Sequence, residues 1–252
     1  MRDMLISILV LGSVFIGALL QRITGLGVGL VSGPVLSSLL GPLPGVTMVN
    51  GLSTINAANN AWSVRKNTRW RAFRLLAGSL VAGTLPGLFV VHLINGPWLL
   101  VAVGGLVLMA LAVATFNPKG AVFSQDAAAP MVITGLVAGF MSVIAGIAGP
   151  SMNVYCRLAG WDYREFIATM HPVILIGNFT SFMLKAVLLG GFDIHGVPTW
   201  IWFGAIAMIF VGAWVGDRVD RHLSTTMARR MATILATIGA SAVLFQGVAQ
   251  LI

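Results

Sequence analysis

Long apolar runs separated by short polar or glycine-rich breaks occupy nearly the whole chain. They cover about 4–22, 28–41, 46–64, 74–92 and 98–116 in the first half, and about 131–147, 149–160, 166–189, 198–216 and 227–248 in the second. About 20 apolar residues are needed to cross the roughly 30 Å of hydrocarbon in a bilayer, so the runs 28–41 and 149–160 are too short to span. The pattern predicts an all-α polytopic membrane protein with about eight spanning helices and two short segments that return to the side they came from.

Both short runs begin at a break rich in glycine and proline. The first break reads Gly25-Leu26-Gly27-Val28-Gly29 and is followed by Pro34, and the second reads Gly146-Ile147-Ala148-Gly149-Pro150. In lipid, a broken helix is tolerated only where it is buried in protein or lines a polar cavity, because its freed backbone groups need partners. Two such breaks at matching places in two halves are typical of a transport site. We therefore expect the substrate site at Gly25, Gly27, Gly29, Gly146 and Gly149.

The chain divides into two membrane repeats, 1–120 and 121–252. The spacing Gly83-x-x-x-Gly87 recurs as Gly212-x-x-x-Gly216, and we interpret these glycines as positions where two helices approach closely. Basic clusters at 65–74 and 218–230 should both be cytoplasmic, yet they follow the third run of one half and the fourth run of the other. The repeats are therefore predicted to be inverted in the cytoplasmic membrane, with both termini outside the cytoplasm. Arg157 and Arg164 agree with this orientation, whereas Arg2, which would be outside, fits it less well.

Composition excludes the soluble classes of protein. The 252 residues are 58% hydrophobic and only 9% charged, and the formal net charge of +8 comes from the loop clusters, so nucleic-acid binding is not indicated. A single cysteine, Cys156, excludes an internal disulfide and a cysteine-based metal site, and we expect no cofactor. The first run meets Gln21-Arg22 instead of the small residues of a cleavage site, which predicts a retained helix.

Polar residues within the predicted spans are hydrogen-bond donors or neutral groups, while the seven carboxylates lie at span ends or in loops. Such a membrane interior favours an anion, since helix N-termini at the breaks also present N–H groups and partial positive charge. Arg22 can bind an oxyanion through two parallel hydrogen bonds. His171, Asn178, Ser181 and Lys185 share one quadrant of a helix. The predicted polar site residues are Gln21, Arg22, Ser32, Asn50, Ser53, Asn56, Ser151, Asn153, His171 and Asn178.

The motifs resemble those of the TauE/SafE (TSUP) family of sulfite exporters. That family has a glycine-rich stretch followed by proline in each half, which stands here as Gly25-x-Gly27-Val28-Gly29 with Pro34 and, less regularly, as Gly146-x-x-Gly149-Pro150. The resemblance implies a secondary transporter that exports sulfite or an organosulfonate such as sulfoacetate by alternating access. The partners are then a small anion and the lipid bilayer, and faces of small residues permit a homodimer.

Two alternatives remain open from the sequence. An anion channel of other selectivity would use the same donors without alternating access. An intramembrane serine hydrolase would pair Ser151 with His171, although the chain has no Gly-x-Ser-x-Gly elbow there. His171 is also a candidate for coupling anion movement to protons, because histidine titrates near neutral pH; the competing interpretation is a single packing hydrogen bond.

Overall fold

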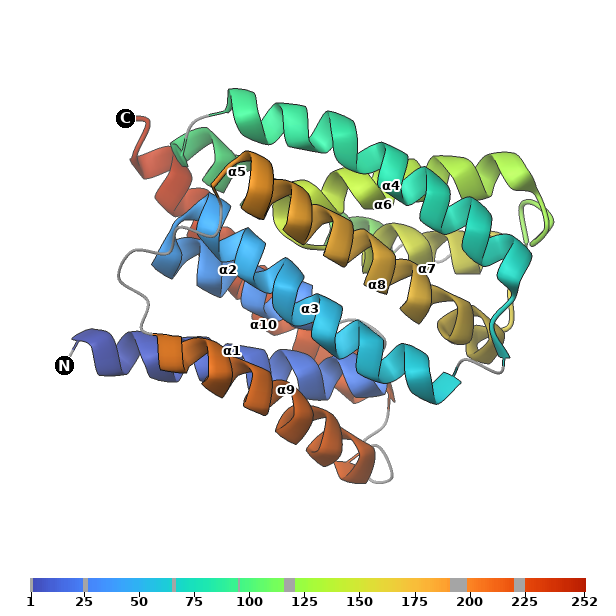
Figure 1. Cartoon of the computed structure of the whole chain (residues 1–252), viewed down its shortest axis with the longest axis horizontal. Coiled ribbons are helices and arrows are strands. Elements are labelled where there is room, and N and C mark those ends of the chain that lie inside the picture. Colours follow the sequence, from blue (N-terminus) through green and yellow to red (C-terminus); the bar gives the residue numbers. More distant parts are fainter. Residues whose placement is uncertain are drawn as a thin grey trace.

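The computed structural model describes residues 2–24, 27–64, 67–94, 96–115, 121–190, 199–219 and 225–252. Gly25 of the predicted site and part of the basic clusters, including Arg65 and Arg221, lie outside the described residues. Over these ranges the chain forms helices and no strands (Figure 1). The helices are α1 (Arg2–Thr24), α2 (Val28–Leu40), α3 (Pro42–Val64), α4 (Trp70–Leu93), α5 (Gly96–Thr115), α6 (Ala128–Ala145), α7 (Gly149–Leu158), α8 (Tyr163–Leu188), α9 (Thr199–Val219) and α10 (Thr225–Ala249).

Each predicted apolar run corresponds to one of these helices, so the all-α membrane fold is confirmed. Within the described residues, seven helices are long and apolar enough to cross a membrane, namely α1, α4, α5, α6, α8, α9 and α10. The helices α2 and α7 have only 13 and 10 residues, as the two short runs predicted. The eighth expected span, α3, is long enough with 23 residues, but its asparagines make it less apolar than the other seven.

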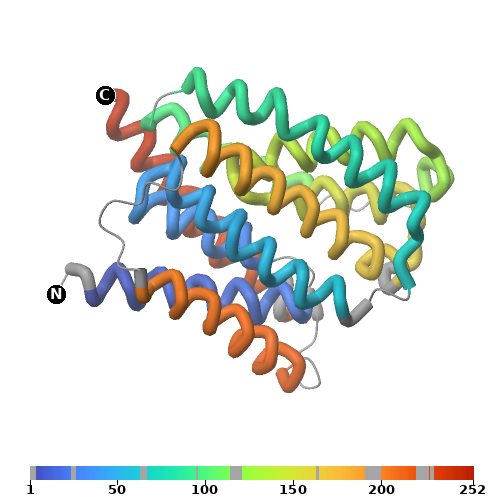
Figure 2. The backbone as a smooth tube through the Cα atoms, viewed as in Figure 1, coloured from blue at the N-terminus to red at the C-terminus, as the bar shows by residue number. Residues whose placement is uncertain are grey.

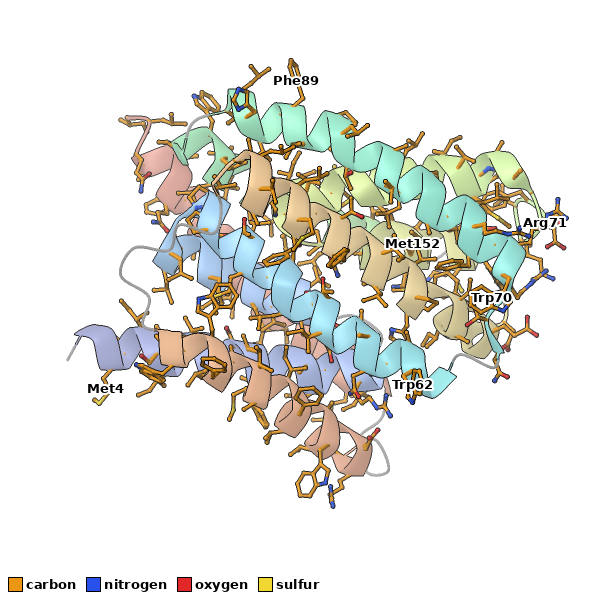
Figure 3. All side chains as sticks on the ribbon, viewed as in Figure 1. Met4, Trp62, Trp70, Arg71, Phe89 and Met152 are labelled. Atoms are coloured by element: carbon orange, nitrogen blue, oxygen red, sulfur yellow. The ribbon has the colours of Figure 1, made fainter. Side chains whose placement is uncertain are left out.

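The helices run side by side, and both termini lie at the same end of the bundle (Figures 1 and 2). The segment 121–127 lies at the opposite end, together with Arg71, which Figure 3 labels there. Trp62 and Trp70 are exposed at that end (Figure 3). Trp98 and Trp200 are exposed in the first turns of α5 and α9, and these helices begin at the end near the termini (Figure 1). Tryptophan at both ends of an apolar helix bundle is typical of the two membrane–water interfaces.

Helices of the two halves pack against each other crosswise. The most extensive contacts join α4 to α6, α1 to α9, α3 to α8 and α5 to α10. The first helix of each half therefore packs on the fourth helix of the other half. A Cβ added at Gly83 of α4 would overlap the carbonyl oxygen of Leu136, and one at Gly212 of α9 would lie 2.6 Å from that of Phe15. The predicted packing role of these glycines is confirmed. Each lies against another helix of the same chain, so it is not on a surface open to a second copy.

The polarity of the molecule is that of a membrane protein. Large apolar side chains such as Phe203 and Phe245 are exposed, and so is Phe89, which Figure 3 labels on the outside of the bundle. The interior contains Asn50, Asn56 and other polar side chains that are completely buried. Polar side chains in a bilayer face protein or a cavity, so this interior is where a polar solute can be held.

Candidate substrate site

The two glycine breaks meet in the interior of the bundle and line one cavity. Its walls come from α1, α2, α3, the turn between α6 and α7, and α8. The lining residues are Gln21, Gly27, Gly29, Leu30, Ser53, Gly146, Ile147, Ala148, Gly149, Pro150, Ile174 and Asn178. The cavity offers about 30 Å³ to the centres of water molecules. Since one water needs about 10–15 Å³ on this measure, the cavity has room for only about two or three waters.

Glycine is required where the breaks touch. A Cβ on Gly29 would overlap the carbonyl oxygen of Gly146, and one on Gly33 would lie 3.3 Å from that of Ala145. Gly146 ends α6 in the left-handed region, with φ +71°. Only glycine adopts that conformation without strain, so the close approach of the two breaks depends on both residues.

Two helix N-termini face the cavity, because α2 begins at Val28 and α7 begins at Gly149 beside it. The first N–H groups of a helix have no acceptor within that helix, and the helix dipole places about half a positive charge there. None of the described residues that line the cavity is Asp or Glu. The backbone therefore makes an environment suited to a negative charge.

Two side-chain amides add donors to this environment. The N–H of Val28 donates to Gln21 Oε1 at 3.0 Å, and Ser142 Oγ donates to Asn178 Oδ1 at 3.1 Å. Because each amide oxygen already accepts a hydrogen bond from the protein, the NH₂ groups of Gln21 and Asn178 are the parts left for a ligand. Both residues line the cavity, so donors reach it from α1 and from α8.

Several buried polar atoms in the interior of the bundle have no hydrogen-bond partner, and one of them, on Ser53, belongs to a residue that lines the cavity. In the described part of the chain, the hydroxyls of Ser32 and Ser53, both polar side-chain atoms of Asn56 and Nδ1 of His171 are buried without a hydrogen-bond partner. Asn50 donates from Nδ2 to the carbonyl of Ser142 at 3.2 Å, while its Oδ1 has no partner. Buried polar groups without partners are rare and cost about 1–3 kcal/mol each, so such a cluster is typical of a functional site.

Comparison with known proteins identifies the family of the chain. The family model described as "Sulfite exporter TauE/SafE" matches residues 9–243. The chain belongs to the TauE/SafE family. It is 27% identical over 184 residues to a protein of Comamonas testosteroni named "Probable inner membrane transporter protein TsaS", a match that covers 70% of this chain and 73% of that protein. No solved structure matches the chain.

Membership in TauE/SafE makes the chain a multi-pass membrane transporter and not an enzyme. The serine hydrolase alternative also lacks its central contact. Ser151 Oγ donates to the carbonyl of Ala148 at 3.0 Å, in its own turn of chain, and not to His171.

The structure brings about half of the predicted TauE/SafE site residues onto one cavity wall: Gln21, Gly27, Gly29, Ser53, Gly146, Gly149 and Asn178. Ser32, Asn50, Asn56 and His171 are buried but do not line it. Ser151 and Asn153 were expected to offer side-chain donors. Instead Asn153 Nδ2 donates to Gly149 O at 3.1 Å and Ser151 to Ala148, so both satisfy their own helix.

Arg22 lies in an ion pair and not on the cavity wall. Its Nε and one terminal nitrogen donate to the two carboxylate oxygens of Asp217 on α9, at 2.5 and 3.3 Å, and Nη1 donates to Asn60 Oδ1 at 2.9 Å. A carboxylate of the protein thus occupies the fork that we expected to bind an oxyanion. Gly216 makes room for this arrangement, since a Cβ there would lie 2.9 Å from Cβ of Arg22.

We expect the double variant Arg22→Ala/Asp217→Asn to change transport no further than Arg22→Ala alone. Both substitutions remove the ion pair between α1 and α9, and Arg22→Ala also removes the hydrogen bond to Asn60; effects within one contact are not additive. The loss of stability should be about 1 kcal/mol or less, because the two side chains are 28% and 56% exposed. The measurement is anion uptake by purified protein in vesicles. A large effect of Arg22→Ala with none from Asp217→Asn would instead assign Arg22 to the anion.

Sequence reasoning missed Ser142, which joins three parts of the site. Its hydroxyl contacts both Asn178 Oδ1 and Ser181 Oγ at 3.1 Å, and its carbonyl accepts from Asn50. A signal for it was present. Ser142 stands four residues before Gly146, just as Gln21 stands four residues before Gly25.

Proposed function

We propose that this TauE/SafE protein exports sulfite, or an organosulfonate such as sulfoacetate, across the cytoplasmic membrane by alternating access. One observation, more than any other, supports the choice of an anion as the substrate. Two helix N-termini and the NH₂ groups of Gln21 and Asn178 converge on a cavity whose described lining has no carboxylate. The choice of a sulfur oxyanion rests on membership in a family of sulfite exporters.

We also propose that 1–120 and 121–252 are inverted repeats that move against each other. The crosswise packing supports this, since α1 packs on α9 as α6 packs on α4, and α3 packs on α8. Inverted repeats of this kind carry their substrate site at the interface, at broken helices near the middle of the membrane. The cavity between the two breaks supports this proposal.

A carrier fits the structure better than an open pore. Two ion pairs, Arg22–Asp217 and Arg69–Asp126, join the two halves at the end of the bundle away from the termini. The cavity admits only about two or three waters, which supports a movement of the halves before an anion enters or leaves.

The deciding experiment is counterflow with purified protein in vesicles that are loaded in turn with sulfite, sulfate, thiosulfate, sulfoacetate or chloride. A carrier for sulfur oxyanions gives saturable uptake of labelled sulfite that is accelerated by unlabelled sulfite or sulfoacetate inside, and not by chloride. Flux that rises linearly with concentration and shows no counterflow would identify a channel. Acceleration by chloride alone would refute the proposed substrate.

We expect cysteines at the two ends of the bundle to label from opposite sides of the membrane. The end with Arg69, Arg71 and Arg74 should be cytoplasmic, because positive residues are retained on that side, which leaves both termini outside. Ser124→Cys and a cysteine added after Ile252 test this with an impermeant maleimide on intact and opened cells. Cys156 is buried and gives little background. Labelling of both positions from the same side would refute the orientation.

A further inference from the structure

Lys185 is a charged side chain placed in the interior of the bundle. It lies on α8 and is completely buried. Its Nζ donates to the carbonyl of Val143 at 3.1 Å, near the C-terminal end of α6. An ammonium group has three donors, and this is the only acceptor for it among the described residues. The C-terminal end of the α6 dipole carries partial negative charge and stabilises the ammonium of Lys185 in part. It leaves the net charge of that ammonium uncompensated.

No carboxylate compensates Lys185 within the described ranges. The helix α8 packs on α3, α4, α6 and α7. Of these four helices, α3 and α6 have no ionisable side chain. The ionisable side chains of the others and of α8 itself are Arg71, Arg74 and His92 on α4, Tyr155, Cys156 and Arg157 on α7, and Tyr163, Arg164, Glu165 and His171 on α8. The only acidic group among them, Glu165, stands twenty residues before Lys185 at the other end of α8.

A chain of hydrogen bonds begins one turn before Lys185, at Ser181, and leads to the cavity. Ser181, one turn before Lys185, contacts Ser142 Oγ at 3.1 Å, and the same hydroxyl donates to Asn178 on the cavity wall. Side chains on a helix lean toward its N-terminus, so Lys185 leans toward Ser181 and the cavity. Seven residues separate Lys185 from Asn178, which is about 10 Å along the helix axis.

A buried ammonium without a counter-charge is unfavourable, and ionisable groups inside a membrane are retained mostly for function. An anion in the cavity would supply the missing negative charge at a distance where Coulomb attraction in a protein interior is still substantial. We propose that Lys185 is the counter-charge of the transported anion and sets the affinity according to the charge of that anion. This inference rests on the proposed function, since it assumes that the cavity takes an anion.

The test compares anions of different charge on the same variants. Thiosulfate carries two negative charges and methanesulfonate carries one, and each is used to compete with labelled sulfite in counterflow. At about 10 Å and an effective dielectric constant of about 20, removal of one positive charge should weaken binding about tenfold for each negative charge. Lys185→Met and Lys185→Gln should therefore lose about tenfold in affinity for methanesulfonate and about 100-fold for thiosulfate. Methionine is apolar and of similar length, so the fold should tolerate it.

Arg74→Gln is the matched control, because it also removes one positive charge but from an exposed side chain on α4. Salt screens such a charge, so both anions should keep their affinity within about twofold. Equal losses for the two anions in the Lys185 variants, or no loss, would overturn the proposal and leave a packing role. Absence of counterflow in the wild-type protein with every anion would instead refute the proposed function, which keeps the two failures distinct.

Discussion

Gly29→Val should abolish anion counterflow while the protein still inserts in the membrane. A Cβ at this position already overlaps the carbonyl oxygen of Gly146, and the two methyl groups of valine would push the breaks further apart. Overpacking of this kind costs about 1–3 kcal/mol, which a polytopic protein can survive, but the cavity would lose its geometry. We expect at least a 100-fold fall in counterflow rate, measured against the amount of folded protein by size-exclusion chromatography in detergent.

Gly12→Val is the control for that experiment. Gly12 lies on α1, the same helix that leads into the first break, and an added Cβ there meets nothing within 4 Å. The variant should therefore transport at close to the wild-type rate. Normal counterflow by Gly29→Val would mean that the two breaks do not need to touch for transport.

Gln21→Glu should reduce transport by a similar factor for an electrostatic reason. The new carboxylate keeps the size of the side chain and still accepts the hydrogen bond from the N–H of Val28, but it replaces the NH₂ donor by a negative charge. A hydrogen bond to a charged group contributes about 1.5–3 kcal/mol, or roughly 10- to 100-fold in affinity, and repulsion of the anion adds to that loss. Asn178→Asp should behave in the same way, since its oxygen would still accept from Ser142.

The measurement for these variants is the concentration dependence of sulfite counterflow, with Gln250→Glu as the control. Gln250 is exposed near the C-terminus, so the same substitution there should leave the affinity unchanged. If Gln21→Glu binds sulfite as the wild type does, the donors of the cavity face something other than the anion. A cavity that gains affinity for cations in this variant would still support an electrostatic role for the site.

Much of the fold followed from local sequence. The ten runs correspond to ten helices in the described residues, because the length of an apolar run sets the length of a membrane helix. The helix α3 was also anticipated, as the run 46–64, although its asparagines lower its hydropathy below that of the seven clearly apolar long helices. The spacing Gly83-x-x-x-Gly87 indicated a close helix contact, which α4 makes with α6.

The candidate site was harder to predict, because residues with suitable chemistry differ in whether their side chains face the cavity or bond to the protein. Ser151 and Asn153 have the right chemistry, yet they bond to their own helix, which no spacing rule distinguishes from pointing at a ligand. Arg22 was read as an anion ligand because no acid is near it in the sequence. Its partner, Asp217, is 195 residues away.

The sequence by itself determined the class of protein, the positions of the two breaks and the excess of donors over carboxylates inside the membrane. These are local properties, since hydropathy, glycine and proline act on their own segment of chain. Only the tertiary structure decided that the breaks meet, that the amides of Gln21 and Asn178 present their NH₂ groups to one cavity, and that Lys185 is buried without a carboxylate among the described residues. Those facts depend on distances between helices that are far apart in the chain, and such distances are set by how the helices pack and not by any one helix.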